Sequence, residues 1–127
     1  MATLLLIDDD TAVRQMLESL FSSAHECHTA DRAEQALEYL QFQKYDLVIT
    51  DVSMPGLGGV EVLQQVKKQH GTTPVIVISG RPDQYKDMVL EMGAFAFLAK
   101  PFALSAIESS VADAIAQSRQ QSSMTLP

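Results

Sequence analysis

The sequence predicts one α/β domain built on a five-stranded parallel sheet with helices on both faces. Short apolar runs rich in β-branched residues alternate with longer segments whose apolar residues recur at helical spacing. Strands that are apolar throughout are typical of a parallel sheet, because both faces are covered. Repeated strand–helix units imply right-handed crossovers, and a chain of 127 residues has the length of one domain. We therefore expect a doubly wound sheet in a single domain.

Apolar runs between turn-forming residues define the expected strands. The first, Leu4-Leu5-Leu6-Ile7, leads into Asp8, and a second run of the same character ends at Asp51. The predicted strands, in chain order, are residues 4–8, 26–30, 47–51, 75–79 and 96–99.

Helical periodicity fills the segments after these runs. The third helix is expected over about residues 60–69, and the fourth, short and weakly amphipathic, over about 83–92. The apolar faces of the others are Val13, Met16, Leu17, Leu20 and Phe21 in the first, Ala33, Ala36, Leu37 and Leu40 in the second, and Leu104, Ile107, Val111, Ala114 and Ile115 in the fifth.

Capping residues agree with these boundaries. Asp10 or Thr11 can cap the first helix, since Asp and Thr are favoured there. Asp31 with Glu34 three residues later has the spacing of a capping box for the second helix. Glycines stand where the third and fourth helices should end, at positions 71 and 93.

Composition excludes several classes of protein. The net charge of −7 argues against direct binding to nucleic acid, which requires clustered Lys and Arg. No apolar run is long enough to span a bilayer, and the amino terminus lacks the basic start of a signal peptide. The one cysteine, Cys27, cannot form an internal disulfide, so we expect a structural role for it and a cytoplasmic location.

The carboxyl end of the chain differs in character from the rest. From Gln117 onward it is polar and lacks apolar periodicity. We therefore expect a domain over residues 1–118 and a flexible tail or the start of a linker over residues 119–127.

Candidate functional residues stand at the ends of the predicted strands: Asp8, Asp9, Asp51, Ser79 and Lys100. Because ligands of such sheets bind outside the carboxyl ends of the strands, these residues should meet at one edge. Two carboxylates about 4 Å apart repel by roughly 4 kcal/mol at an effective dielectric constant near 20, so the cluster needs a cation. Mg²⁺ is the natural candidate, since it prefers oxygen ligands and leaves positions open for phosphate oxygens.

Four motifs in this order resemble the receiver domain of two-component response regulators, the CheY-like family. They are the acidic pair Asp8-Asp9, the run from Asp51 through Val52-Ser53-Met54-Pro55-Gly56, the hydroxyl residue Ser79, and Lys100-Pro101-Phe102. The resemblance covers roughly residues 3–118. It implies a strand order of 2-1-3-4-5 and a cis peptide bond between Lys100 and Pro101.

The resemblance also implies roles for single residues. Asp51 would accept a phosphoryl group from a phosphohistidine of a partner kinase or from a small phosphodonor. Mg²⁺ would be held by Asp8, directly or through water, by Asp9 and Asp51, and by the backbone carbonyl of Ser53. Lys100 would neutralise the incoming phosphoryl oxygens, which suits its compact ammonium charge.

Signal output would follow from the same site. The resemblance implies that the Ser79 hydroxyl turns onto the new phosphoryl group and that Phe97 follows it inward as the switch aromatic. Many relatives carry Tyr in place of Phe97 and Thr in place of Ser79. Ser53 and Arg81 stand at the two variable positions that, in the family, influence how readily water reaches the phosphoaspartate. We hypothesise that Arg81 covers or contacts the phosphoryl group and slows hydrolysis.

Structural explanations remain open for several of these residues. Asp8, Asp9, Asp51 and Ser79 are also ordinary turn formers at strand ends, and Phe97 is buried core in that case. The histidines, His25, His28 and His70, do not cluster at metal-ligand spacing, so we expect structural or surface roles.

Alternative functions follow from departures from the pattern. A receiver used only as an interaction module would lack part of the acidic trio or Lys100, and all are present. An aspartyl phosphatase characteristically has a second acid two residues after the nucleophile, where this chain has Ser53. A flavodoxin-like carrier would need a Gly- or Ser/Thr-rich phosphate loop after the first strand, where Asp8-Asp9-Asp10 would repel phosphate.

Expected partners are a histidine kinase or phosphotransfer protein and an output domain or partner protein. A homodimer through the face of the fourth helix, fifth strand and fifth helix is a further possibility. The sequence leaves the identity of the kinase and of the output open.

Overall fold

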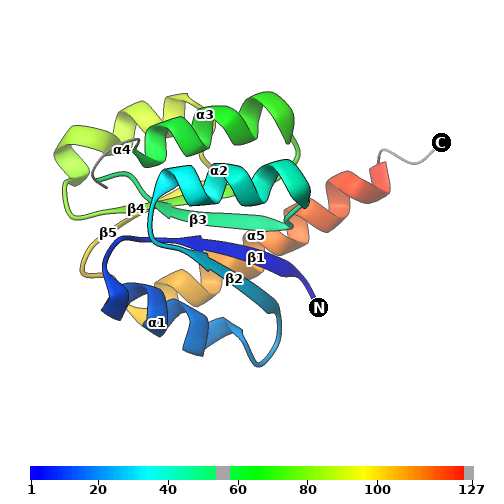
Figure 1. The fold of residues 1–127 in the computed structure, drawn as a ribbon, viewed down its shortest axis with the longest axis horizontal. Helices are drawn as coiled ribbons and strands as arrows, with labels where there is room; N and C mark the ends of the chain where they lie inside the picture. Colours follow the sequence, from blue (N-terminus) through cyan, green and yellow to red (C-terminus); the bar gives the residue numbers. More distant parts are fainter. Residues whose placement is uncertain (54–57, 125–127) are drawn as a thin grey trace.

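A computed structural model describes residues 1–53 and 58–124. Its parallel sheet has the order β2-β1-β3-β4-β5, and helices cover both faces (Figure 1). The elements are β1 (Thr3–Ile7), α1 (Thr11–Phe21), β2 (Glu26–Ala30), α2 (Ala33–Phe42), β3 (Leu47–Asp51), α3 (Gly59–Gln69), β4 (Val75–Ser79), α4 (Pro82–Glu91), β5 (Ala96–Ala99) and α5 (Leu104–Met124). The predicted fold class and strand order are confirmed.

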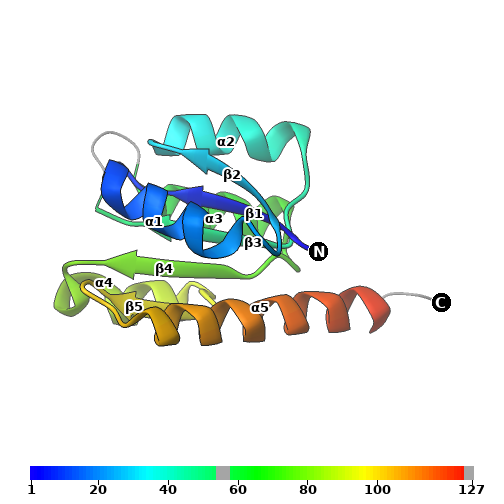
Figure 2. The same ribbon diagram turned by 90° about the horizontal axis from the view of Figure 1, so that it is seen from below.

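Alternate residues of each strand face different layers of helices. In β1, Leu5 and Ile7 pack in one core with residues of α2, α3 and α4. Leu4 and Leu6 point the other way, into a core shared with α1 and α5. Figure 2 shows α5 lying along the sheet on this second side. Both faces are therefore apolar, which explains why the strand sequences lack polar alternation.

The direction of strand addition reverses between β1 and β3. The chain moves outward from β1 to β2, crosses back to β3 on the other side of β1, and continues to β4 and β5. The crossover helices on the two sides of such a point leave the sheet on opposite faces, which opens a crevice at the carboxyl ends. Asp8 follows β1 and Asp51 ends β3, so both lie at this crevice.

Two of the predicted helix ends are confirmed. Asp10 Oδ1 accepts the backbone N–H groups of Ala12 at 2.9 Å and Val13 at 3.4 Å, so Asp10 is the N-cap of α1. Helix α4 ends at Met92, and Gly93 follows with a φ of 102°, a conformation that glycine adopts without strain.

The predicted capping box of α2 is wrong. The N-cap is Arg32 rather than Asp31, so the third helical position is Gln35 and not Glu34. Gln35 Oε1 accepts the backbone N–H of Asp31 at 3.2 Å, while the Asp31 carboxylate accepts from Arg32 at 2.9 Å. Because the helix starts one residue later than expected, Gln35 takes the place of Glu34 as the acceptor of the Asp31 N–H.

Helix α5 is longer than the sequence pattern predicts. It runs to Met124, so residues 119–124 are helical where we expected an irregular tail. Gln, Ser and Arg are adequate helix formers, and extending an existing helix avoids the cost of nucleation. Figure 2 shows the end of α5 projecting beyond the sheet. The domain boundary at residue 118 stays a prediction. None of the helices in the described ranges combines the length and apolar character needed to cross a membrane.

Candidate functional site

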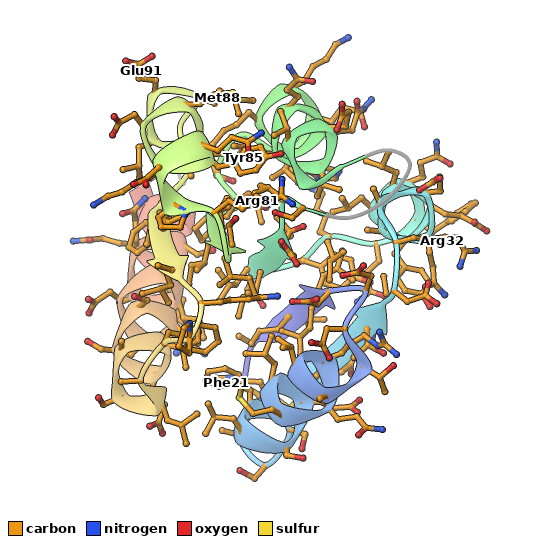
Figure 3. All side chains as sticks on the ribbon, turned by 90° about the vertical axis from the view of Figure 1, so that its left-hand side faces the viewer. Phe21, Arg32, Arg81, Tyr85, Met88 and Glu91 are labelled. Carbon is orange, nitrogen blue, oxygen red and sulfur yellow. The ribbon has the colours of Figure 1, made fainter. Side chains whose placement is uncertain are left out.

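Four strands bring polar side chains to the carboxyl edge of the sheet. Asp8 follows β1, Asp51 ends β3, Ser79 ends β4 and Lys100 follows β5. Figure 3 looks onto this edge. The residues that the sequence placed on one edge therefore come together, although they are distant along the chain.

Lys100 lies between two buried carboxylates. Its Nζ donates to Asp8 Oδ2 at 2.8 Å and to Asp51 Oδ2 at 3.0 Å. The exposed fraction of the side chain is 22% for Lys100, 0% for Asp8 and 6% for Asp51. Solvent and salt therefore screen these ion pairs much less than pairs on the surface. The Lys100 ammonium group therefore orients one oxygen of Asp8 and one of Asp51 toward itself.

Asp9 completes an acidic cluster with Asp8 and Asp51. One carboxylate oxygen of each lies within 4.8 Å of the others, with Asp9 exposed and the other two buried. Three carboxylates face one ammonium here, so negative charge is in excess. Carboxylate oxygens are the ligands that Mg²⁺ prefers. The donor set therefore fits a divalent cation held by Asp8, Asp9 and Asp51.

Burial and charge shift the titration of two groups in the site. Burial raises the pKa of Asp8 and outweighs the hydrogen bonds from Lys100 and from the Asp10 backbone, and the charge of Asp51 adds to the increase. For Lys100, burial acts to lower the pKa, but the hydrogen bonds to Asp8 and Asp51 prevail and raise it. Lys100 therefore stays protonated at neutral pH, and the buried Asp8 carboxylate needs further positive charge.

Both oxygens of Asp51 are held in place. Oδ2 accepts from Lys100, and Oδ1 accepts the backbone N–H of Ser53 at 2.8 Å. A carboxylate fixed at both ends is well oriented for reaction, because it loses little freedom when a reactant approaches.

Glycine at position 59 is a requirement that sequence reasoning missed. A Cβ built on Gly59 would lie 2.0 Å from the carbonyl oxygen of Asp51. Helix α3 begins at this residue, so its first turn packs directly on the backbone of Asp51. The pair Gly58-Gly59 was the available signal, because glycine often marks a close backbone approach.

Arg14 is a second residue that the sequence did not single out. Its guanidinium donates to the carbonyl oxygen of Asp8 at 2.8 Å and to Thr11 Oγ1 at 3.4 Å. It therefore ties the first turns of α1 to the end of β1. A single Arg within a helical segment gives no sequence signal for such a contact, although Arg14 is half-buried in the structure.

Ser79 occupies the edge between Asp51 and α4. Its hydroxyl oxygen accepts the backbone N–H of Arg81 at 2.9 Å and lies 3.3 Å from Ser53 Oγ. Its carbonyl accepts the backbone N–H of Lys100 at 2.8 Å, which joins β4 to the loop after β5. The peptide bond between Lys100 and Pro101 is cis, as the sequence resemblance implies.

Phe97 is the expected switch residue, and Arg81 is the residue expected to cover the phosphoryl group. Phe97 is half-buried on β5 and packs against the core that includes Val89 of α4. Arg81 is exposed and is the N-cap of α4, between the end of β4 and the helix (Figure 3). Met54, Pro55 and Gly56, which belong to the motif that follows Asp51, lie outside the described residues.

An apolar groove of about 350 Å³ opens beside the acidic cluster. It is lined by Val13, Met16, Lys100, Pro101 and Phe102. It therefore connects α1 with the loop after β5, and Lys100 belongs to both the groove and the ion pairs.

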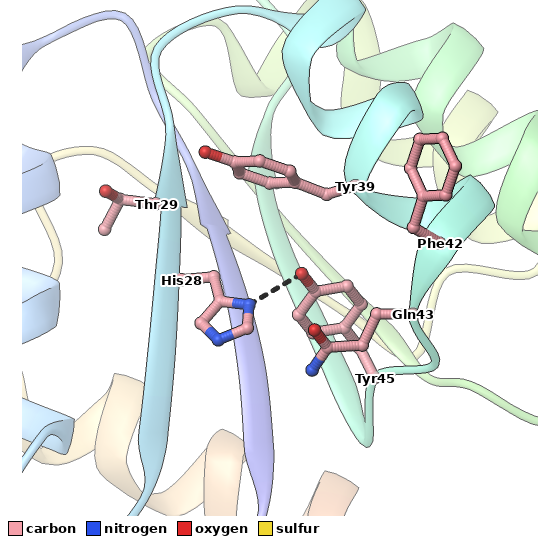
Figure 4. A pocket seen from close by; sticks show the side chains of 6 residues that line it. All are labelled: His28, Thr29, Tyr39, Phe42, Gln43 and Tyr45. Carbon is pink, nitrogen blue, oxygen red and sulfur yellow. Dashed lines mark hydrogen bonds between the residues drawn. The ribbon is translucent and has the colours of Figure 1, made fainter.

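A second pocket, of about 400 Å³, lies between β2, the end of α2 and the segment before β3 (Figure 4). His28 Nδ1 is 2.8 Å from the hydroxyl of Tyr45 and its Nε2 is 2.8 Å from Glu26 Oε2. Burial raises the pKa of Tyr45 to about 12. These contacts are consistent with the structural role expected of His28.

Comparison with protein families gives a match over residues 4–112 to the response regulator receiver domain. The DNA-binding transcriptional regulator NtrC of Escherichia coli is 31% identical over 118 residues, which cover 91% of this chain and 25% of NtrC. The transcriptional regulatory protein FixJ of Bradyrhizobium diazoefficiens is 35% identical over 114 residues, covering 88% of this chain and 56% of FixJ. The chain thus spans between a quarter and somewhat over half of these relatives.

Solved structures show the same fold. A response regulator receiver domain protein from Clostridium thermocellum superposes with a TM-score of 0.87 at 28% identity, covering 95% of this chain and 99% of that one. The response regulator TrrA of Thermotoga maritima, solved in complex with Mg²⁺ and BeF, gives 0.81 at 28% identity, covering 90% and 99%.

Proposed function

The chain belongs to the response regulator receiver family of two-component signalling, and from this membership we propose that Asp51 is its phosphoacceptor. The observation that carries the proposal is the position of the Asp51 carboxylate, between the ammonium of Lys100 and the carboxylates of Asp8 and Asp9. The donor is the phosphohistidine of a histidine kinase or phosphotransfer protein. The domain is a signalling domain and not a classical enzyme.

The reaction is a phosphoryl transfer between two side chains. An oxygen of Asp51 forms a bond to phosphorus while the bond from phosphorus to the histidine nitrogen of the donor breaks, and the imidazole leaves. Such transfers have a loose transition state, so positioning and charge neutralisation supply most of the catalysis. In this proposal the domain takes part in its own phosphorylation and dephosphorylation.

The residues of the site divide these tasks. Lys100 holds Asp51 in place and neutralises phosphoryl oxygens, since its raised pKa keeps it charged. Asp8, Asp9, Asp51 and the Ser53 carbonyl would hold Mg²⁺, which would supply further positive charge. The Ser53 N–H orients the Asp51 carboxylate through Oδ1.

The apolar groove is the proposed docking site for the phosphodonor. Its wall of Val13, Met16 and Phe102 gives a partner helix apolar surface to cover, and Lys100 connects the groove to the acidic cluster. A histidine carried on that partner helix would then reach Asp51 directly.

Output follows from the added charge. A phosphoryl group brings about −1.5 to −2 charge and new acceptor oxygens. In our proposal Ser79 turns its hydroxyl onto this group, Phe97 moves inward, and the packing of α4 changes between two populations. The signal passes to an output domain or partner protein, with a dimer through α4, β5 and α5 as one route. We propose that this takes place in the cytoplasm, consistent with the unpaired Cys27.

An aspartyl phosphatase is a weaker alternative. Such an enzyme would need an acid two residues after the nucleophile, and Ser53 stands there with its N–H committed to Asp51. A receiver that is never phosphorylated is also disfavoured, because Lys100 contacts Asp8 and Asp51, and Asp9 lies within 4.8 Å of both carboxylates.

The intact mass after incubation with acetyl phosphate tests the proposal. We expect a gain of one phosphoryl group that requires Mg²⁺ and disappears in Asp51→Asn. The exposed Glu34→Gln serves as the matched control and should be modified like the unaltered protein. No gain, under conditions that modify another receiver domain, would favour the interaction module.

A further inference from the structure

The hydroxyl of Ser79 is buried and already engaged. Ser79 has an exposed fraction of 0%. Its oxygen accepts the Arg81 N–H at 2.9 Å, so the hydroxyl proton needs a separate acceptor. Ser53 Oγ, at 3.3 Å, is the one such acceptor that we find within residues 1–53 and 58–124. Either hydroxyl of this pair can act as the donor, and we assign Ser79 as the donor because its oxygen already accepts the Arg81 N–H.

Ser53 is fixed to the nucleophile on its other side. Its backbone N–H donates to Asp51 Oδ1 at 2.8 Å. The backbone of Ser53 is thus held beside Asp51, and its hydroxyl oxygen lies 3.3 Å from that of Ser79. Ser53 therefore contacts both the Asp51 carboxylate and the Ser79 hydroxyl, the two groups that interact in the proposed switch.

We infer that Ser53 is a positioning residue that keeps the Ser79 hydroxyl in its resting arrangement. Ser79 has one proton to donate, so it must leave Ser53 Oγ before it can donate to a phosphoryl oxygen on Asp51. The inference rests on the proposed function of Asp51 and Ser79, and it extends that function to the side chain at position 53.

The geometry suits a contact that opens. Most O–H···O hydrogen bonds measure about 2.5–3.0 Å, so the 3.3 Å separation of the two hydroxyls indicates a weak bond. A weak bond biases the resting state without preventing the exchange of partners. A charge-assisted bond to a phosphoryl oxygen is stronger and would win once that group is present.

Removing the Ser53 hydroxyl changes the balance between the two states. Ser53→Ala leaves the Ser79 proton without its acceptor in the resting state but not in the phosphorylated one. The resting state is then less favoured, and a ligand that selects the active state binds more tightly by the same factor. The loss of one weak hydrogen bond corresponds to about a three- to tenfold change.

Beryllofluoride with Mg²⁺, a phosphoryl analogue, is the probe. Its apparent Kd is measured by NMR titration on the full chain for the unaltered protein, Ser53→Ala, Ser53→Thr, Ser79→Ala and the double variant. Ser53→Ala should bind about three- to tenfold more tightly, and Ser53→Thr, which keeps a hydroxyl, should stay close to the unaltered protein. In the Ser79→Ala background Ser53→Ala should have no such effect, because the coupling acts through Ser79.

A second readout needs no ligand. In the unliganded protein, exchange of the Arg81 amide should accelerate in Ser53→Ala, because the loosened Ser79 oxygen is its acceptor. If Ser53→Ala binds beryllofluoride no more tightly than the unaltered protein, the inference is wrong. It is also wrong if Ser53→Ala still tightens binding in the Ser79→Ala background. Either result would leave the proposed function of Asp51 intact. Failure of the unaltered protein to bind beryllofluoride would overturn the proposed function, and the inference with it.

Discussion

At the level of single residues, the charge balance of the site depends on Lys100. Its ammonium contacts Asp8 and Asp51 within 3.0 Å, and both carboxylates are almost fully buried. A buried carboxylate that loses its partner must either keep an unfavourable charge or take up a proton.

Lys100→Ala is therefore expected to destabilise the protein. We expect the free energy of unfolding at pH 7 to fall by about 1–3 kcal/mol, less than the about 3–5 kcal/mol for a fully buried pair, because Lys100 keeps some contact with solvent. Denaturant unfolding measures the change. The exposed Lys44→Ala is the control and should change the value by less than about 0.5 kcal/mol. An equally small effect at Lys100 would contradict the ion pairs.

Tyr45 gives a prediction for alkaline pH. Burial raises its pKa from 10.0 to about 12, and it is only 5% exposed. A raised pKa in the folded state means that the stabilisation is complete below pH 10 and is lost as the pH rises through about 12. The loss is at most about 2–3 kcal/mol.

Comparison with Tyr45→Phe isolates this contribution from other groups that titrate at the same pH. The free energy of unfolding of the unaltered protein minus that of Tyr45→Phe should be constant below pH 10. This difference should fall between pH 10 and about 12, because only the unaltered protein loses stability through Tyr45. Parallel stability curves across that range would show that Tyr45 ionises as freely in the folded protein as in the unfolded one.

At the level of elements, the position of α3 is fixed by its contact with β3. Gly59, the first residue of α3, leaves no space for a Cβ, because the Asp51 carbonyl oxygen would be 2.0 Å away. Gly59→Ala must displace the helix or the strand, which should lower the free energy of unfolding, measured by denaturant unfolding, by about 1–3 kcal/mol. Gly71→Ala is the matched control, since its Cβ would meet an ordinary contact of 3.5 Å.

The helices also differ in how firmly they are held. Helix α4 buries Val89, whereas α2 buries Ala33, Ala36 and Leu40. Elements with few buried contacts open and shift most easily. We therefore expect beryllofluoride to change hydrogen exchange in α4 and to leave α2 nearly unchanged. Equal protection of α4 with and without the analogue would contradict a switch that acts through this helix.

At the level of the whole molecule, the parts that the sequence predicts are those set by short-range patterns. Strand ends follow from where the apolar runs stop, so Asp51 and Ser79 were placed at the correct edge. Parallel pairing then places the ends of β1 and β5 at the same edge, with β3 and β4 between them, and the long Lys100 side chain reaches Asp8 across that edge. Fold and edge are therefore robust predictions.

Features that depend on one residue of register or on a rotamer were not predictable. The helix start at Ala33 moved the cap from Asp31 to Arg32. The extent of α5 depended on elongation rather than apolar spacing. The hydrogen bond between Ser53 and Ser79 joins residues of two strand ends, and no periodicity encodes its distance.

Chemical mapping of the phosphorylated residue tests the central claim most directly. An aspartyl phosphate is an acyl phosphate, which borohydride reduces to homoserine, and peptide mass spectrometry locates that residue. After phosphorylation in Mg²⁺, the account predicts homoserine at position 51 in the unaltered protein and none in Asp51→Asn. Homoserine at position 8 or 9, or a phosphorylated protein without homoserine at 51, would contradict it.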